Sequence, residues 1–200
     1  MNLYKQVEYK GHNINIYYDE DPLNPRKDFD NLGTLYTAHR RYRPEKELDA
    51  HFDINEVFAN IRNAEFKDSF LKKYIALPVY LYDHGGITIS TSSFSCLWDS
   101  GLFGFIAVSL EDVRKEYGWK VVTAKRREKI EEYLRDEIEM LDNYYTGEVY
   151  GVELTPKGND TEIIHNCWGF FGERGIQEME SECKSIIDRI ASCRWIIRKN

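Results

Sequence analysis

Strand-forming segments in this sequence come in neighbouring pairs joined by short turns, and this arrangement limits the folds that the chain can adopt. Residues 3–18 alternate polar and apolar side chains on both sides of a turn that begins at Gly11. The stretch IALPVYLYDHGGITIST, residues 75–91, places two strand-like runs around the turn DHGG, whose glycines accept positive φ angles without steric cost. Two further runs, 148–154 and 162–168, flank a turn rich in Pro, Gly and Asn. Turns this short join antiparallel strands.

Other segments have helical periodicity. After Thr123 the apolar residues fall on one stripe, with the charges KRREK and EE opposite, until Gly147 ends the pattern. A similar stripe begins at Ile176. We expect Asp53 to cap a shorter amphipathic helix. The apolar residues of that helix would be Val57, Phe58 and Ile61.

These helices do not alternate regularly with the strands, as parallel βαβ units would require. We therefore predict an α+β fold with a mostly antiparallel sheet built from hairpins and with helices packed on one face. With 200 residues, 42% of them hydrophobic, the chain is long enough for one sizeable core and short for two. We expect a single globular domain over residues 1–200.

The composition is acidic. The 34 Asp and Glu residues outnumber the 27 Lys and Arg residues, and the formal net charge of -7 disfavours general binding to nucleic acid. The four cysteines form no C-x-x-C pair, and the first ten residues are polar and charged. Apolar runs are far shorter than the roughly 20 residues of a membrane span. We therefore expect a cytoplasmic protein with unpaired thiols and no membrane partner.

The segment YYDEDPLNPRKDFDN, residues 17–31, concentrates acidic side chains in a stretch whose two prolines argue against regular secondary structure. These acids are Asp19, Glu20, Asp21, Asp28 and Asp30. They could ligate a cation such as Ca²⁺ or Mg²⁺, present a binding surface to a macromolecule, or lie in a solvated loop. The spacing does not match an EF-hand. In a solvated loop, Arg26 and Lys27 would neutralise part of the charge.

A second candidate lies in FSCLWDSGLFGF, residues 94–105, where Asp99 and Ser100 stand among aromatic side chains. Ser100 could act as a nucleophile if His84 served as its base and an acid oriented that base. The strained G-x-S-x-G elbow of many hydrolases is missing. The alternative is a tight turn in which Asp99 and Ser100 bond to the backbone.

A third candidate is HNCWGFFG, residues 165–172. In a strand, His165 and Cys167 project from the same face, so they could form a nucleophilic pair or half of a metal site. The alternative is a half-buried strand in which Cys167 packs as a small apolar residue.

A basic run, Arg40, Arg41 and Arg43 around Tyr42, could grip phosphates or stack on bases. In an acidic protein such residues more often pair with carboxylates. The sequence contains no P-loop, no G-x-G-x-x-G, no H-E-x-x-H and no zinc-type spacing of Cys and His.

Several strings together resemble a family of uncharacterised proteins encoded by bacteriophages, conjugative plasmids and other mobile elements. They are YYDEDPLNPRKDFDNLGTL, HRRY, LYDHGGITIS, WDSGLFGFI, TGEVYGV and CWGFFG. The likeness runs from about residue 17 to residue 172 and leaves the final helix uncovered. It implies a counter-defence protein of the anti-CRISPR or anti-restriction type, acting in the bacterial host cell on a defence protein or nucleoprotein.

Two functional hypotheses follow. In the first, the protein binds and inhibits a nucleic-acid-targeting defence complex through the acidic segment, because negative charge complements a basic nucleic-acid-binding surface. In the second, it is a metal-dependent hydrolase acting on nucleotides or nucleic acid. That enzyme would combine a divalent cation held by the acidic segment with Asp83, His84 or Asp99.

Overall fold

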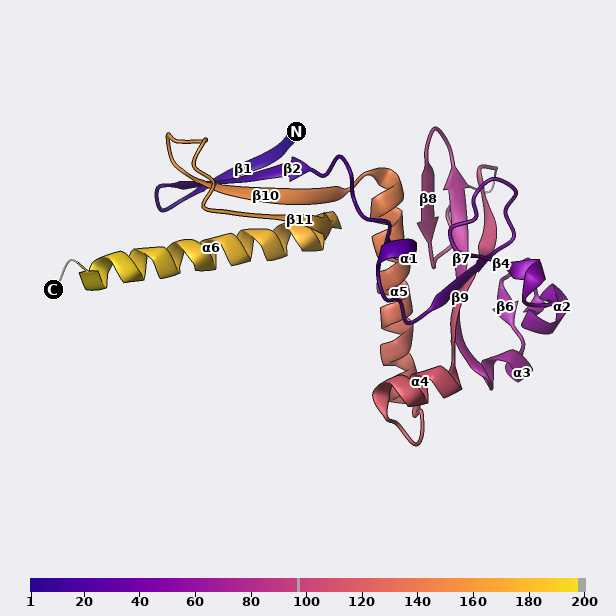
Figure 1. Ribbon diagram of the computed structural model, residues 1–200. Helices are drawn as coiled ribbons and strands as arrows, with labels where there is room; N and C mark the ends of the chain where they lie inside the picture. Colours follow the sequence, from indigo (N-terminus) through magenta and orange to yellow (C-terminus); the bar gives the residue numbers. More distant parts are fainter. Residues whose placement is uncertain (97, 198–200) are drawn as a thin grey trace. The chain divides into compact units, whose positions relative to one another are not determined.

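The computed structural model describes residues 1–96 and 98–197, without the side chains of 193–197. With 35% helix, 34% strand and mostly antiparallel sheets, the protein has the predicted α+β fold. Its contacts divide it into two compact units (Figure 1). The central unit is Asn24–Thr146, and the terminal unit combines Met1–Leu23 with the chain from Gly147 onwards. The single domain expected from the sequence stays a prediction. None of the described helices is long and apolar enough to cross a membrane.

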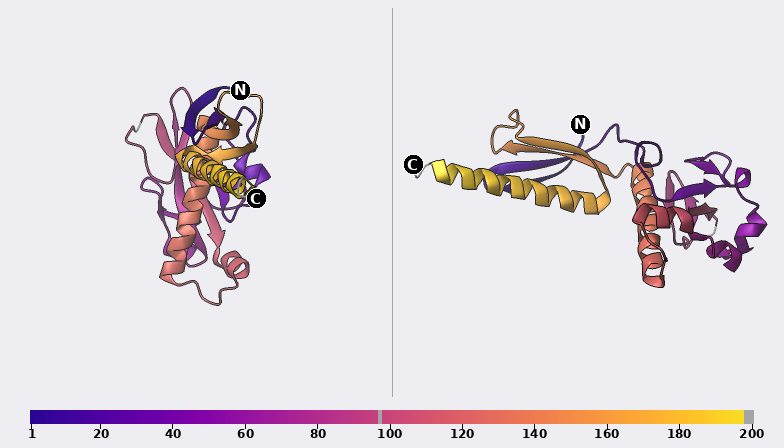
Figure 2. Two further views of the ribbon diagram at one scale, coloured as in Figure 1. Left: turned by 90° about the vertical axis from the view of Figure 1, so that its left-hand side faces the viewer. Right: turned by 60° about the horizontal axis from the view of Figure 1, so that its bottom comes forward.

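The described part of the terminal unit is an antiparallel sheet with one long helix. Its strands are β1 (Leu3–Tyr9), β2 (His12–Tyr18), β10 (Val149–Pro156) and β11 (His165–Phe171), in the order β1-β2-β10-β11. Helix α6 (Gly172–Ile197) runs along one face of this sheet (Figures 1 and 2). Alternate strand residues meet the apolar stripe of α6 there. The core residues are Ile14, Ile16, Tyr150, Val152, Leu154, Ile176, Met179, Cys183 and Ile187.

A two-residue turn sets the register of the β1–β2 hairpin. Lys10 and Gly11 have φ angles of 46° and 76°, the pair of positive values that a type I′ turn needs. The turn was expected to begin at Gly11, but it begins at Lys10, and His12 already belongs to β2 and pairs with Tyr9. This two-residue turn matches the right-handed twist of the two strands.

The central unit is built around a second sheet, with strand order β4-β3-β9-β7-β8. Its strands are β3 (Thr34–Thr37), β4 (Lys46–Glu47), β7 (Tyr74–Asp83), β8 (Ile87–Ser90) and β9 (Ser100–Ser109). All the pairs are antiparallel except β3 with β4. Helices α4 (Leu110–Tyr117) and α5 (Ala124–Thr146) supply the apolar side chains that cover one face. From α5 these are Ile130, Leu134, Ile138 and Leu141, the predicted stripe.

Short elements and aromatic side chains cover the other face of this sheet. The elements are η1 (Leu48–Ala50), α2 (Ile54–Val57), β5 (Phe58–Asn60), β6 (Glu65–Phe66) and α3 (Asp68–Leu71). Phe105 of β9 is fully buried among them, with the rings of Phe52, Phe58, Phe66 and Phe70 5.5–6.0 Å from its own ring.

This arrangement corrects one prediction. Asp53 caps α2 by accepting a hydrogen bond from the Asn55 backbone N–H, as expected, but the helix ends at Val57. Phe58 and the residues after it pair with β6 as a strand instead. Burial of Phe58 against Phe105 in a strand conformation overrides the weak helical periodicity of this short segment.

The backbones of β3 and β9 lie unusually close together. A Cβ atom on Gly104 would lie 1.9 Å from the carbonyl oxygen of Tyr36, so no other residue fits at position 104 without moving β3. Beyond this contact, Ile106 and Val108 face the α5 side, whereas Phe105 and Ala107 face the aromatic side.

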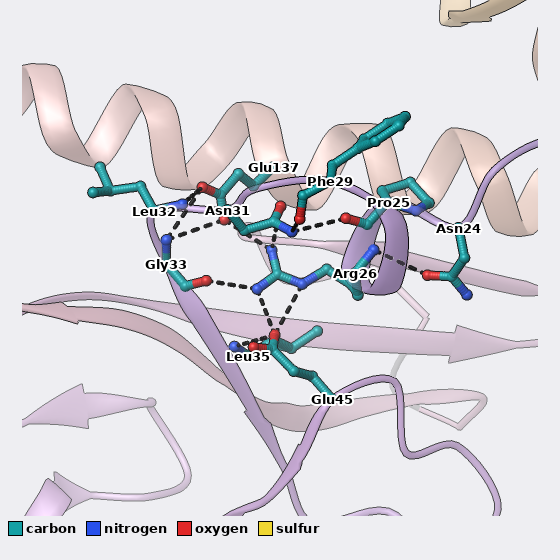
Figure 3. A network of polar contacts seen from close by, with 10 residues as sticks. All are labelled: Asn24, Pro25, Arg26, Phe29, Asn31, Leu32, Gly33, Leu35, Glu45 and Glu137. Carbon is teal, nitrogen blue, oxygen red and sulfur yellow. Dashed lines mark hydrogen bonds and ion pairs between the residues drawn. The ribbon is translucent and has the colours of Figure 1, made fainter.

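A buried arginine anchors the segment that opens the central unit. Arg26 lies in the one-turn helix α1 (Pro25–Asp28), and 1% of its side chain is exposed (Figure 3). Its Nη1 lies 2.8 Å from Glu137 of α5, and its Nε and Nη2 donate to Glu45. Nη2 also donates to the Gly33 carbonyl at 2.6 Å, and Nη1 to Asn31 at 3.1 Å. The guanidinium thereby ties three stretches of chain to one point.

The two glutamates of this network also hold the backbone that enters β3. Glu137 accepts hydrogen bonds from the backbone N–H groups of Leu32, at 2.7 Å, and Gly33, at 3.2 Å. Glu45 accepts one from the Leu35 N–H at 2.9 Å. Each carboxylate therefore has both a cation and backbone donors, the arrangement that offsets the cost of removing charge from water.

Replacing Arg26 by methionine should lower the free energy of unfolding by about 3–5 kcal/mol, because Glu45 and Glu137 would be left half-buried without their cation. Urea denaturation followed by circular dichroism measures this change. The matched control is Arg43→Met, which breaks an exposed pair with Glu47 and should cost no more than about 1 kcal/mol. Equal losses in the two variants would contradict the anchoring role of Arg26.

Burial of two phenols predicts a loss of stability at alkaline pH. Burial raises the pKa of Tyr145 to about 12, with neighbouring Tyr144 adding to the effect and Arg26 opposing it. Burial likewise raises the pKa of Tyr150 to about 12, helped by Glu148. An unfolded chain ionises these phenols near pH 10.0. Between those values the folded state holds more protons than the unfolded state, so the free energy of unfolding falls as pH rises.

The measurement is urea denaturation at intervals from pH 8 to pH 12. The contribution of each phenol should be constant below pH 10 and lost between about pH 10 and pH 12. Tyr145→Phe should make this fall shallower, since phenylalanine has no proton to lose. An unchanged slope in that variant would count against the burial of the hydroxyl.

Candidate functional site

Four of the residues predicted from the sequence meet where β7 ends and β9 begins. Because the two strands are antiparallel, Tyr82 pairs with Ser100, and the turn after β7 lies beside the segment before β9. The backbone N–H of Asp83 donates to the Asp99 carbonyl at 2.9 Å. Asp83, His84, Asp99 and Ser100, which are distant in sequence, therefore form one cluster in the central unit.

His84 and Asp99 are joined directly. His84 Nδ1 lies 3.2 Å from Asp99 Oδ2, within ion-pair distance of the carboxylate. The Cys96 Sγ approaches the same oxygen at 3.8 Å. The His84 side chain is 70% exposed and Asp99 is 39% exposed, so this pair contributes little to stability and stays accessible to a ligand.

The Ser100 hydroxyl is not part of a nucleophilic triad in this structure. It donates its proton to the backbone carbonyl of Cys96, not to His84. The alternative interpretation from the sequence, in which this serine bonds the backbone, describes the observed contact. Leu97, which belongs to the same segment, lies outside the described residues.

The basic run contacts this cluster through Arg41. Arg41 Nη2 lies 3.0 Å from Asp83 Oδ2, and the Arg41 guanidinium lies 5.6 Å from the ring centroid of Tyr42. His39 stacks on Tyr42 at 5.0 Å, and its Nδ1 accepts the backbone N–H groups of Arg41 and Tyr42. Its remaining proton therefore sits on Nε2. Sequence reasoning missed His39, although the adjacent basic run was a signal for it.

A depression of about 320 Å³ opens at this cluster. His39, Asp83, Asp99, Ser100 and Phe103 line it together with Trp98, which is 96% exposed. An indole so fully in water has lost the burial that normally stabilises this side chain. The depression therefore combines an exposed aromatic anchor with carboxylates that form partly exposed ion pairs.

The predicted acidic residues of segment 17–31 are divided between the two units. Asp19, Glu20 and Asp21 lie in the terminal unit, whereas Asp28 and Asp30 lie in the central unit. In the terminal unit Asp19 accepts the Asp21 N–H at 3.1 Å, and Glu20 lies 3.2 Å from the N-terminal ammonium.

In the central unit, Asp28 lies in α1 and accepts the Asn24 N–H at 2.7 Å, so this stretch contains a helical turn that its prolines were expected to prevent. Pro25 fits there because the first helical position needs no N–H donor. Arg26, expected to neutralise nearby acids in solvent, is instead buried.

His165 and Cys167 project toward α6. Both pair with core residues of β10, Leu154 and Val152, and both are half-buried. No contact joins them to each other in the described part of the chain. Cys167 packs against the core near Cys183, whose pKa is raised to about 11, first by burial and then by Glu182 and Cys167. The side chain of Cys193 lies outside the described residues.

Within residues 1–96 and 98–197, no group of three or more His, Cys, Asp or Glu side chains is placed to hold a metal ion. The divalent cation considered from the sequence stays a prediction.

Comparisons of the chain with protein-family models, with curated proteins and with solved structures found no match. The resemblance to proteins of mobile elements therefore stays a prediction that depends on the quoted strings alone.

The geometry of the cluster predicts the tautomers of its two histidines. At pH 8, long-range ¹H–¹⁵N spectra should place the His84 proton on Nδ1, because a carboxylate oxygen 3.2 Å away favours a proton on that atom. In Asp99→Ala this preference should be lost. His39 is the internal control, since its Nδ1 accepts backbone protons and its Nε2–H form should persist in both proteins. A His84 spectrum unaffected by the substitution would show that the contact does not form.

Proposed function

We propose that this chain is a mobile-element accessory protein that binds and inhibits a bacterial nucleic-acid-targeting defence complex, of the anti-CRISPR or anti-restriction type. The central unit docks on a protein of that complex through the depression beside Trp98. The exposure of this indole, 96%, is the observation that carries the proposal.

Trp98 has the properties of a binding hot spot. Tryptophan, tyrosine and arginine dominate the energy of protein interfaces when they enter a pocket on the partner. Trp98 lines the depression together with Asp83 and Asp99. A partner that covered the indole and filled the depression would therefore also desolvate the pairs that these two carboxylates form with Arg41 and His84. Their fixed charges would then select among partners.

The charge of the chain supports a basic partner. A formal net charge of -7 steers the protein toward positively charged surfaces, which are the surfaces that hold nucleic acid in defence nucleases. Several acids of the two units are exposed and add to this attraction. They are Glu20, Asp21, Asp28 and Asp30.

The hydrolase alternative has less support from the site. Asp83 is paired with Arg41, Asp99 with His84, and the Ser100 proton with a backbone carbonyl. A hydrolase would need these groups to exchange their partners before the reaction, whereas a docking surface uses them as they stand.

The proposal is tested in bacteria that carry a panel of CRISPR and restriction systems. The protein should restore plaque formation or plasmid transfer against at least one system, and affinity capture should recover a component of that nuclease. Trp98→Ala should weaken binding to the recovered component about 30-fold or more, the loss typical of an aromatic hot spot.

Tyr133→Ala removes an exposed aromatic side chain elsewhere in the same unit and should leave binding within about twofold. Thermal melts establish that both variants fold. If the parent protein changes immunity against no system and captures no nuclease component, the proposal is rejected. Equal binding by Trp98→Ala and the parent protein would show that the depression beside Trp98 is not the docking site.

A further inference from the structure

Helix α6 covers one face of the terminal sheet, and the opposite face is the subject of this inference. Within the described part of this unit no helix lies on that face (Figures 1 and 2). The strand register places the same-face residues in rows across the sheet. Tyr17, Gly151 and Trp168 make one row, and Asn15, Glu153 and Asn166 make the next.

The first row is an aromatic platform. The indole of Trp168 lies flat on Gly151, since a Cβ atom there would be 1.9 Å from Trp168 Cε3. The rings of Tyr17 and Trp168 are stacked, with centroids 6.5 Å apart and planes 26° from parallel. Trp168 is 37% exposed, and Leu3, which pairs with Tyr17, is 48% exposed. The sheet thus presents flat apolar surface to solvent.

Glu153 stands in the middle of the next row without a partner. It is half-buried on a central strand, and no hydrogen bond or ion pair of its carboxylate is formed within residues 1–96 and 98–197. The other two acids of this face are engaged: Glu8 lies 2.8 Å from Lys157, and Asp160 accepts from Asn13 at 3.4 Å. A half-buried carboxylate without a cation is costly and gains from an incoming one.

Glu153 also lies close to the aromatic platform. The pKa of Tyr17 is raised above its ordinary value, first by burial and then by the negative charges of Glu153 and Asp160. The same two charges that disfavour a phenolate would favour a cation over the ring. A chain of hydrogen bonds from Gln6 to Asn15, at 2.6 Å, and from Asn15 to Thr155, at 3.3 Å, holds the surrounding side chains in place.

We infer that this face of the terminal unit is a recognition site for an arginine side chain of a protein partner. The guanidinium stacks on Tyr17 and Trp168 and forms an ion pair with Glu153. Arginine suits the site better than lysine because its planar group stacks on rings and offers paired donors to a carboxylate. Charge complementarity identifies the occupant, since among the described residues this face carries Glu8, Glu153 and Asp160 against the cation Lys157.

Nucleic acid is the less suitable occupant of this platform. Aromatic side chains on a four-stranded sheet do stack bases in some proteins, but they do so within basic surroundings. Here the carboxylates would repel the phosphates. The inference does not depend on the depression at Trp98, because it concerns different residues of the other unit.

The test uses the full chain and a peptide of alternating glycine and arginine, with calorimetry and the indole ¹H–¹⁵N signals as readouts. The arginine peptide should bind and shift the Trp168 signal. The same peptide with citrulline, which keeps the shape and removes the charge, should bind at least tenfold more weakly. A lysine peptide should fall between the two.

Two substitutions within the site should each weaken arginine-peptide binding at least tenfold, Glu153→Gln by removing the charge and Trp168→Ala by removing the platform. Glu153→Gln is isosteric, so it remains informative even if Trp168→Ala fails to fold. Tyr133→Ala, which removes an exposed aromatic side chain from the other unit, should change binding less than twofold.

Equal binding of the arginine and citrulline peptides, or unchanged binding by Glu153→Gln, would overturn the inference. Tighter binding of single-stranded DNA than of the arginine peptide would identify a base-stacking platform instead. A dimer that Trp168→Ala dissolves would identify a second copy of the chain as the occupant. Failure of this peptide test leaves the immunity assay unaffected, and a negative immunity assay leaves the peptide result standing, so the two proposals are judged separately.

Discussion

A single buried guanidinium organises the entrance to the central unit. Arg26 would be prohibitively costly to bury by itself, and the fold meets this cost with two carboxylates, one carbonyl and one amide. Those partners come from the loop after α1, from the segment before β4 and from α5. Glu137 and Glu45 in turn hold the backbone that enters β3, so the position of that strand depends on the charge network. Because β3 pairs with β9, the network also helps to fix the edge of the central sheet.

The two sheets of the protein differ in how their faces are used. The central sheet is covered on both faces, by α4 and α5 on one and by a cluster of phenylalanines on the other, and the cluster around His84 and Asp99 lies where β7 ends and β9 begins. The terminal sheet has one face packed on α6 and offers the other for recognition. A covered sheet thus places its functional groups in turns, and a half-covered sheet can place them on its strands.

Local patterns predicted much of this structure. The α+β class, the DHGG hairpin, the Asp53 cap of α2 and the apolar stripe of α5 all follow from short-range rules of turns, caps and periodicity. The prediction that the helix after Asp53 includes Phe58 and Ile61 was wrong, because the aromatic cluster around Phe105 is assembled from distant segments. The role of Arg26 depends on partners that are distant in sequence, Glu45 and Glu137. The role of Glu153 depends on the lack of such a partner among the described residues. Spacing along the chain encodes neither property.

The order of the units along the chain has a consequence for biosynthesis. Strands β1 and β2 are made before the central unit, but β10, to which β2 pairs, starts some 130 residues after β2 ends. At ribosomal speeds of about 5–20 residues per second, the nascent hairpin waits on the order of ten seconds with an unpaired edge. The central unit, by contrast, is continuous in sequence and can close before α6 is translated. The first hairpin is therefore the segment most exposed to chaperones and to mispairing with neighbouring nascent chains.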